Sequence, residues 1–282
     1  AWDMTRDGEW GARDFARLVL GNIAHETDSS VVQTLLRQLV SALDLYVAPE
    51  HRAETYAWAA DRLWDLARAA EPGSDAQLQL TRVAAARSTS PAHLDAVAGL
   101  LDGSAPLPGL EVDTDLRWDL LVALVAGGRA GEAEIDAELA RDATASGERK
   151  AAAARAAIPT PEAKAAAWRA VVDEDAVTNA IQTATIAGFG RVHDTALLAP
   201  YVEPYFAALE RVWAERTNEM AQNIVVGLYP ARLAGSPDVD VLARTDAWLA
   251  ALGDRTPALR RLVVEERDGV RRALAAQARD RA

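Results

Sequence analysis

The sequence offers few residues whose type and spacing could do chemistry, and the pair His25-Glu26 is the first to test. A helical zinc-peptidase site needs H-E-x-x-H, in which two histidines one turn apart bind the metal and the glutamate acts as a base. The second histidine position is Ser29 here, so the motif is absent. The other histidines, at positions 51, 93 and 193, are far apart in sequence, which favours surface or packing roles.

Other motifs also favour structural interpretations. The acid pairs Glu132/Glu134 and Glu265/Glu266 lie on charged helix patterns and are predicted to be solvated, not to act as a general acid and base. The stretch G-G-R-A-G at 127–131 follows no strand pattern, so it indicates a turn between helices and not a phosphate loop. With no cysteine, thiolate chemistry and disulfides are excluded. The sequence therefore predicts no catalytic residue, no metal ligand and no cofactor within this chain.

Composition narrows the class of partner. The 30 basic and 42 acidic residues give a net charge of -12, and no basic run occurs, which argues against nucleic acid and against an anionic membrane surface. No apolar run reaches the roughly 18 residues of a membrane-spanning helix. The hydrophobic share of 50% is ample for a core.

Helical periodicity is clearest between residues 114 and 172. Leucines there recur three or four apart, as one face of a helix requires: Leu116, Leu120, Leu121 and Leu124. Gly127-Gly128 is predicted to end this helix, and Ser146-Gly147 to end the next one. Thr160-Pro161 is predicted to begin the fourth helix of the stretch, with Thr160 as its cap.

Short helical hairpins of this kind cannot bury a face alone and must stack on neighbours. No segment shows the alternation of a strand, and helix starts recur about every 30 residues, near the length of helical-hairpin repeats. We therefore predict an all-α fold: a single domain over residues 1–282, built as a superhelical array of antiparallel helix pairs, HEAT-like or armadillo-like, and curved into a bowl. Residues 102–113, rich in Gly and Pro, are expected to form an internal loop.

The segment from Val177 to Gly190 carries no charge, which indicates an inner helix. Asn179 and Gln182 lie one turn apart on it, and Arg191 follows directly. Two interpretations stay open: the two amides bridge neighbouring helices and Arg191 is a surface residue, or all three face a groove or cavity. The eight tryptophans are predicted to be mainly packing residues.

Several stretches resemble the C-terminal domain of bacterial aminopeptidase N, in the M1 zinc aminopeptidase family. The likeness extends over nearly the whole chain and is closest to actinobacterial members, whose C-terminal region is similar to that of endoplasmic-reticulum aminopeptidases. The stretches are W-D-M-T-R-D-G-E at 2–9, E-T-D-S-S-V-V-Q at 26–33, D-L-R-W-D-L-L at 115–121, A-G-E-A-E-I-D-A-E-L-A-R-D at 130–142, P-Y-V-E-P-Y-F-A-A-L-E-R-V-W at 200–213 and E-M-A-Q-N-I-V-V-G-L-Y-P at 219–230.

The resemblance implies a multidomain, cytoplasmic enzyme that removes N-terminal residues from peptides. Its catalytic domain carries a G-A-M-E-N-type motif, H-E-x-x-H and a further Glu ligand for zinc, none of which is present here. The resemblance thus implies a non-catalytic helical domain, inactive alone and without its first helices, which closes over the active site of the same chain. The peptide substrate would then meet Asn179, Gln182 and Arg191.

Two other functional classes remain open on the sequence. Helical arrays often bind proteins or peptides on a concave face, so the chain could be a stand-alone scaffold or adaptor. The gene separates these interpretations: an upstream frame encoding H-E-x-x-H supports the aminopeptidase, and a start codon near Ala1 supports the scaffold. A third possibility is an enzyme with an unrecognised site, which a cluster of perturbed carboxylates or histidines in a deep pocket would favour.

Overall fold

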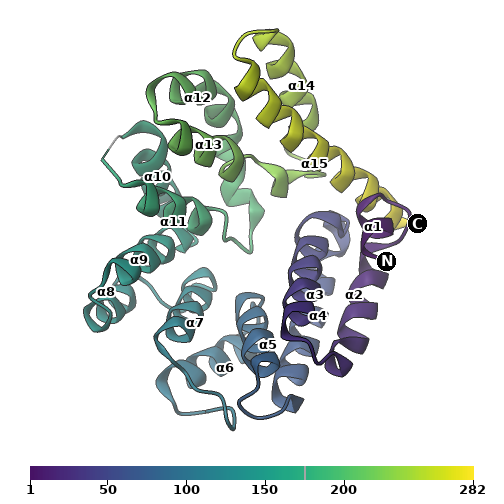
Figure 1. Cartoon of the computed structure of the whole chain (residues 1–282), viewed down its shortest axis with the longest axis vertical. Coiled ribbons are helices and arrows are strands. Elements are labelled where there is room, and N and C mark those ends of the chain that lie inside the picture. The colour runs from purple at the N-terminus through teal and green to yellow at the C-terminus, as the bar shows by residue number, and fades with distance from the viewer. Residues whose placement is uncertain (175) are drawn as a thin grey trace. The chain divides into compact units, whose positions relative to one another are not determined.

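The structure is a computed structural model that describes residues 1–174 and 176–282 (Figure 1). Every regular element in these residues is a helix, which confirms the all-α prediction. The chain packs as two compact units: unit 1 comprises residues 1–127 and 272–282, and unit 2 comprises residues 128–271. The predicted single domain and curved superhelical array concern the whole chain and stay predictions. No helix in the described part is both long and apolar enough to cross a bilayer.

Unit 1 is built from seven α-helices, two short irregular helices and the last residues of α15. The elements are α1 (Trp2–Arg6), α2 (Ala12–Asn22), η1 (Ile23–His25), α3 (Ser29–Ser41), η2 (Ala42–Tyr46), α4 (Pro49–Ala69), α5 (Asp75–Ala86), α6 (Pro91–Asp102) and α7 (Thr114–Ala126).

Unit 2 contains the remaining helices. They are α8 (Glu132–Arg141), α9 (Ala145–Ala157), α10 (Pro161–Trp168), η3 (Arg169–Asp173), α11 (Asn179–Phe189), η4 (Thr195–Tyr201), α12 (Val202–Glu215), α13 (Asn218–Gly227), η5 (Ala231–Leu233), α14 (Val241–Leu252) and α15 (Pro257–Arg281), which belongs to unit 2 as far as Arg271.

Most helices begin where one polar side chain accepts an N–H of the first turn. Thr160 accepts the N–H of Ala163, and Pro161 follows it as predicted. Such a cap stabilises a helix by about 1 kcal/mol. At the other end, α7 stops where Gly127 and then Gly128 follow, and Gly128 takes the positive φ of 70° that glycine tolerates. The other side-chain caps are Asp28, Ser74, Ser90, Asp113, Thr144, Thr178, Asp194, Thr217 and Asp240.

The prediction that Ser146-Gly147 ends a helix is wrong. The helix before it, α8, stops at Arg141, and Thr144 caps α9 by accepting the N–H of Gly147. Gly147 lies in the first turn of α9, where a Cβ would overlap the carbonyl oxygen of Asp142. A close backbone approach, and not a helix end, therefore requires glycine here.

The core of unit 1 surrounds α7, which packs on α5 and α6. Its last seven residues are all buried, so its apolar surface extends around the helix instead of forming one stripe. Trp64 of α4 is also buried, and its indole N–H donates to Ser88 Oγ at 3.1 Å. The segment between α6 and α7 is held by the buried Gln77, whose amide donates to the carbonyl of Pro108 at 3.1 Å.

In unit 2, the backbones of α9 and α11 lie close together. A Cβ on Gly188 would overlap the carbonyl oxygen of Ala153, so only glycine allows α11 to lie this near α9. Aromatic rings fill the space beside this contact: the ring centroids of Phe189 and Tyr201 are 5.0 Å apart, and those of Trp168 and Tyr201 are 5.2 Å apart. Four tryptophans are buried in the two units, as predicted for packing residues: Trp64, Trp118, Trp168 and Trp248.

Asp280 ties the C-terminal end of α15 to the starts of two helices in unit 1. Its side chain is 1% exposed. One carboxylate oxygen accepts the N–H of Arg13 in the first turn of α2 at 2.9 Å, and the other accepts the N–H of Ala48 at the start of α4 at 3.1 Å. The N-cap residues of these helices, Gly11 and Ala48, provide no side-chain cap. Asp280 supplies this cap from more than 230 positions away, and the Arg13 guanidinium pairs with it at 3.2 Å.

We expect Asp280→Ala to lower the free energy of unfolding by about 3 kcal/mol, because it leaves two backbone N–H groups without an acceptor and the Arg13 guanidinium without its carboxylate partner. The matched control is Asp268→Ala on the same helix, where the side chain is 57% exposed and a loss of at most about 1 kcal/mol is expected. Urea unfolding measures both. Equal losses for the two variants would contradict the anchoring role of Asp280.

Candidate functional site

Asn179 and Gln182, at the start of α11, share one partner on α13. The amide of Asn223 donates to Asn179 Oδ1 at 2.9 Å, to Thr183 Oγ1 at 3.1 Å and to Gln182 Oε1 at 3.4 Å. Gln182 is wholly buried, whereas Asn179 is partly exposed. The amides thus join α11 to α13, and part of Asn179 remains accessible at the edge of this cluster.

Arg191 lies just past the other end of α11. Its backbone N–H donates to the carbonyl of Gly188 at 3.0 Å, and the residue is partly exposed. Since α11 has 11 residues and rises 1.5 Å per residue, its two ends are about 15 Å apart. The structure therefore brings Asn179 and Gln182 together but places Arg191 away from them, at the opposite end of the same helix.

Two cations hold the C-terminal end of α11. The Lys164 ammonium donates to the carbonyls of Ala156 at 2.6 Å and Phe189 at 3.1 Å, near the C-terminal ends of α9 and α11. The Arg232 guanidinium donates to the carbonyl of Gly190 at 2.6 Å. A helix C-terminus carries partial negative charge and unpaired carbonyls, so positive groups are favourable there. This arrangement positions the backbone that leads into Arg191.

Lys164 itself is wholly buried. Burial disfavours its charged form and is the main reason that its pKa falls from 10.5 to about 8; the positive charge of Arg232 lowers it further. The carbonyls of Ala156 and Phe189 accept from the amine in either protonation state. Lys164 is therefore a structural group that titrates near the upper end of the physiological range.

The paired acids of the sequence have separate roles. Glu134 accepts the N–H of Gly131 at 2.8 Å and so caps α8, and Glu132 pairs with Arg155 at 2.9 Å. Glu265 pairs with Arg261 at 2.8 Å on the exposed side of α15. Glu266 differs from the prediction of a solvated group: burial, and then the charge of Glu265, raise its pKa to about 7.

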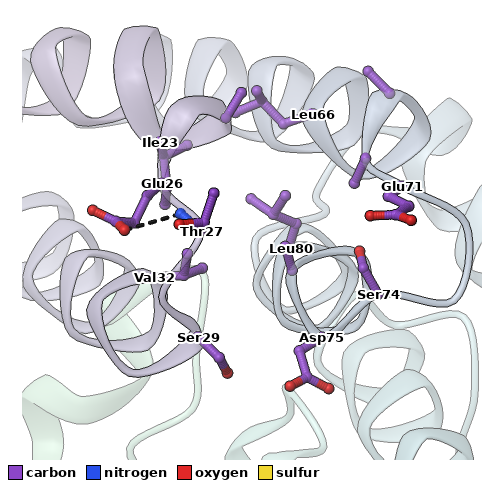
Figure 2. A pocket seen from close by; sticks show the side chains of 14 residues that line it. Ile23, Glu26, Thr27, Ser29, Val32, Leu66, Glu71, Ser74, Asp75 and Leu80 are labelled. Atoms are coloured by element: carbon purple, nitrogen blue, oxygen red, sulfur yellow. Dashed lines mark hydrogen bonds between the residues drawn. The ribbon is translucent and has the colours of Figure 1, made fainter.

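A pocket of about 460 Å³ lies in unit 1 among η1, α3, α4 and α5. Figure 2 shows its apolar wall, which we define as Ile23, Val32, Leu66 and Leu80, and its acidic rim, which we define as Glu26, Glu71 and Asp75. Glu26 lies on one side of the space, and Glu71 and Asp75 lie on the other (Figure 2). No basic residue is among the side chains that line this pocket.

Comparison with known proteins identifies the chain. The sequence model of the family described as "ERAP1-like C-terminal domain" matches residues 1–272. The chain belongs to this family. It is also 53% identical over 283 residues to aminopeptidase N of Streptomyces lividans, across 100% of the chain and 32% of that protein. The actinobacterial aminopeptidase resemblance is thereby confirmed, and the chain spans about a third of the length of this relative.

The described residues of this ERAP1-like C-terminal domain do not fit a zinc ion. No group of three or more His, Cys, Asp or Glu side chains within residues 1–174 and 176–282 could hold a metal. His93 lies against an acid instead, with its Nε2 2.8 Å from Asp61 Oδ1, and His25 ends η1 on the surface.

Sequence reasoning did not identify the residues that hold α11 in this ERAP1-like domain. Asn223, Lys164 and Arg232 come from three other elements and meet α11 only in the folded chain. One signal was available: Lys164 is one of only two lysines in a chain that otherwise uses arginine. An arginine has a larger planar head, whereas an ammonium is a compact donor suited to two converging carbonyls.

The buried amine predicts a pH dependence of stability. Lys164 has a lower pKa in the folded chain than in the unfolded one, so between about pH 8 and pH 10.5 the unfolded state holds the extra proton and stability rises with pH. We expect the free energy of unfolding of the native chain, minus that of Lys164→Met, to be level below about pH 8 and to rise above it by at most about 1.4 kcal/mol per pH unit.

Urea unfolding at several pH values measures this difference. Lys150→Met removes the other lysine, which is not wholly buried, and is expected to give a difference that changes much less over the same range. A level difference for Lys164→Met between about pH 8 and pH 10 would show that the amine titrates normally in the folded chain.

Proposed function

We propose that this chain is the non-catalytic C-terminal domain of a zinc aminopeptidase that removes N-terminal residues from peptides. The observation that carries the proposal is the 53% identity over the whole chain to an aminopeptidase N, together with the match to a family described as a C-terminal domain. In this proposal the partner of the domain is the catalytic domain of the same chain, and the enzyme acts in the cytoplasm.

The division of labour in this proposal follows from the residues. The sequence has no H-E-x-x-H, and the described residues offer no group of metal ligands, so zinc and the chemistry that it supplies are assigned to a region of the enzyme outside this chain. The helical domain is then proposed to cover the active site and to shape the cavity that holds the peptide. Such a role needs a rigid surface, and not a reactive group.

The candidate surface for the peptide follows α11. Its amide end exposes part of Asn179, with Gln182 buried behind it, and its other end leads into Arg191. The roughly 15 Å between these ends equals about four to five residues of extended peptide. Amides bond to peptide groups without selecting a side chain, and a guanidinium can hold a carboxylate by two parallel hydrogen bonds. The surface therefore suits peptides of varied sequence.

The proposal predicts that the isolated 282-residue chain hydrolyses no aminoacyl anilide. The physical reason is that no metal-bound water can form without a set of ligands. A chromogenic assay on the purified, folded chain measures this. Hydrolysis that a chelator abolishes would place a metal site within the chain and overturn the assignment.

In the complete enzyme, we expect Arg191→Ala to raise KM about tenfold for longer peptides and to spare a single-residue anilide, because only a longer peptide reaches this end of α11. Steady-state kinetics on both substrates measure the effect. Arg149→Ala, on the exposed side of α9, is the matched control and should change neither KM. Unchanged kinetics of Arg191→Ala on both substrates, at unchanged melting temperature, would remove Arg191 from the site.

A further inference from the structure

The pocket in unit 1 has the size of a small-molecule site. Its volume of about 460 Å³ lies within the range of about 300–1,000 Å³ that is usual for ligand pockets. It is about three times the roughly 150 Å³ of an engineered apolar cavity that binds benzene. Three members of the apolar wall are buried, and Leu66 is partly exposed. The volume can therefore accept an apolar body larger than one benzene ring, and Leu66 is the member of the wall that is most open to it.

The charge of the lining selects the kind of polar group that such a ligand must carry. All three ionisable side chains in the lining are carboxylates: Glu26, Glu71 and Asp75. Glu71 and Asp75 are exposed, and neither makes an ion pair within the described residues. A ligand that fills the pocket removes water from these carboxylates, so a neutral or anionic ligand would leave their charge less well solvated. A cation would compensate it.

The helix starts around the pocket do not reverse this preference. The first N–H groups of α3 and α5 could in principle attract an anion. Some of those donors have partners: Asp28 accepts from Ser30 and Val31, and Ser74 accepts from Gln77. Glu26 accepts the N–H groups of Thr27 and Asp28 through one carboxylate oxygen. A helix N-terminus carries about half a positive charge, whereas each carboxylate of the acidic rim carries a full negative charge, so the lining as a whole still disfavours an anion.

We propose that this pocket binds a small organic ammonium ion, a primary amine whose apolar body lies against the apolar wall and whose charged end faces the acidic rim. The lining includes none of Asn179, Gln182 and Arg191, so this inference does not depend on the proposed function. The ligand class follows from the combination of a partly open pocket that has an apolar wall with a rim of a single charge sign. Phenethylamine is a suitable probe because it joins a phenyl ring to a primary amine.

The test is calorimetric titration of the full 282-residue chain with phenethylamine and with phenethyl alcohol, its uncharged counterpart. The amine should bind with at least about tenfold higher affinity than the alcohol, and added salt should reduce this preference. The double variant Glu71→Gln with Asp75→Asn should weaken amine binding about fivefold and leave the alcohol unchanged. Equal affinities of the native chain for amine and alcohol would overturn the proposal.

Two further variants locate the binding. Glu162→Gln removes an exposed acid from the first turn of α10, away from this lining, and should leave amine binding unchanged. Ala69→Trp places a large ring in the pocket from an exposed position on α4 and should abolish binding of the amine, with folding checked by circular dichroism. Full binding by a folded Ala69→Trp chain, unchanged amine affinity in the double variant, or no saturable binding by the native chain would each refute the site.

Discussion

The carboxylate of Asp280 joins the two ends of unit 1, because it accepts backbone N–H groups at the starts of both α2 and α4. Helix N-termini carry partial positive charge and unpaired donors, so one buried anion can satisfy two of them at once. Burying that anion is unfavourable unless its oxygens are occupied, and Arg13 completes the set. The last turns of α15 and the first helices of the chain therefore stabilise each other, so the free energy of unfolding of one cannot be separated from that of the other.

In unit 2, positively charged side chains bind the C-terminal ends of helices, whereas in unit 1 a negatively charged side chain binds N-terminal ends. Lys164 donates to carbonyls near the C-terminal ends of α9 and α11, and Arg232 donates to Gly190 just beyond α11. The close approach at Gly188 holds the same two helices together. These contacts fix the C-terminal end of α11, and the amide of Asn223 holds its first turns. A helix held in this way can present its exposed groups without rearranging.

The comparisons give the family of this chain, and the structure gives the roles of its charged side chains. Membership of the ERAP1-like C-terminal domain family and the likeness to an aminopeptidase N give the chain its context, while Glu134 caps a helix and His93 lies against an acid. The pocket in unit 1 is a distinct feature, since its acidic rim and apolar wall belong to η1, α3, α4, α5 and their connections.

The sequence by itself determined the helical class, many helix boundaries and the family. Thr160-Pro161 and Gly127-Gly128 act on the backbone within one turn, so their signals are readable locally. Ser146-Gly147 was misread because the contact that requires Gly147, with Asp142, belongs to the turn before α9 and not to a helix end. Only the tertiary structure decided which groups serve helices that lack caps of their own. Asp280 lies 267 positions from Arg13 and Lys164 lies 25 from Phe189, and no periodicity predicts which distant charge meets which helix end. The same holds for Asn223 and for the pocket, whose walls come from segments that meet only when the chain packs.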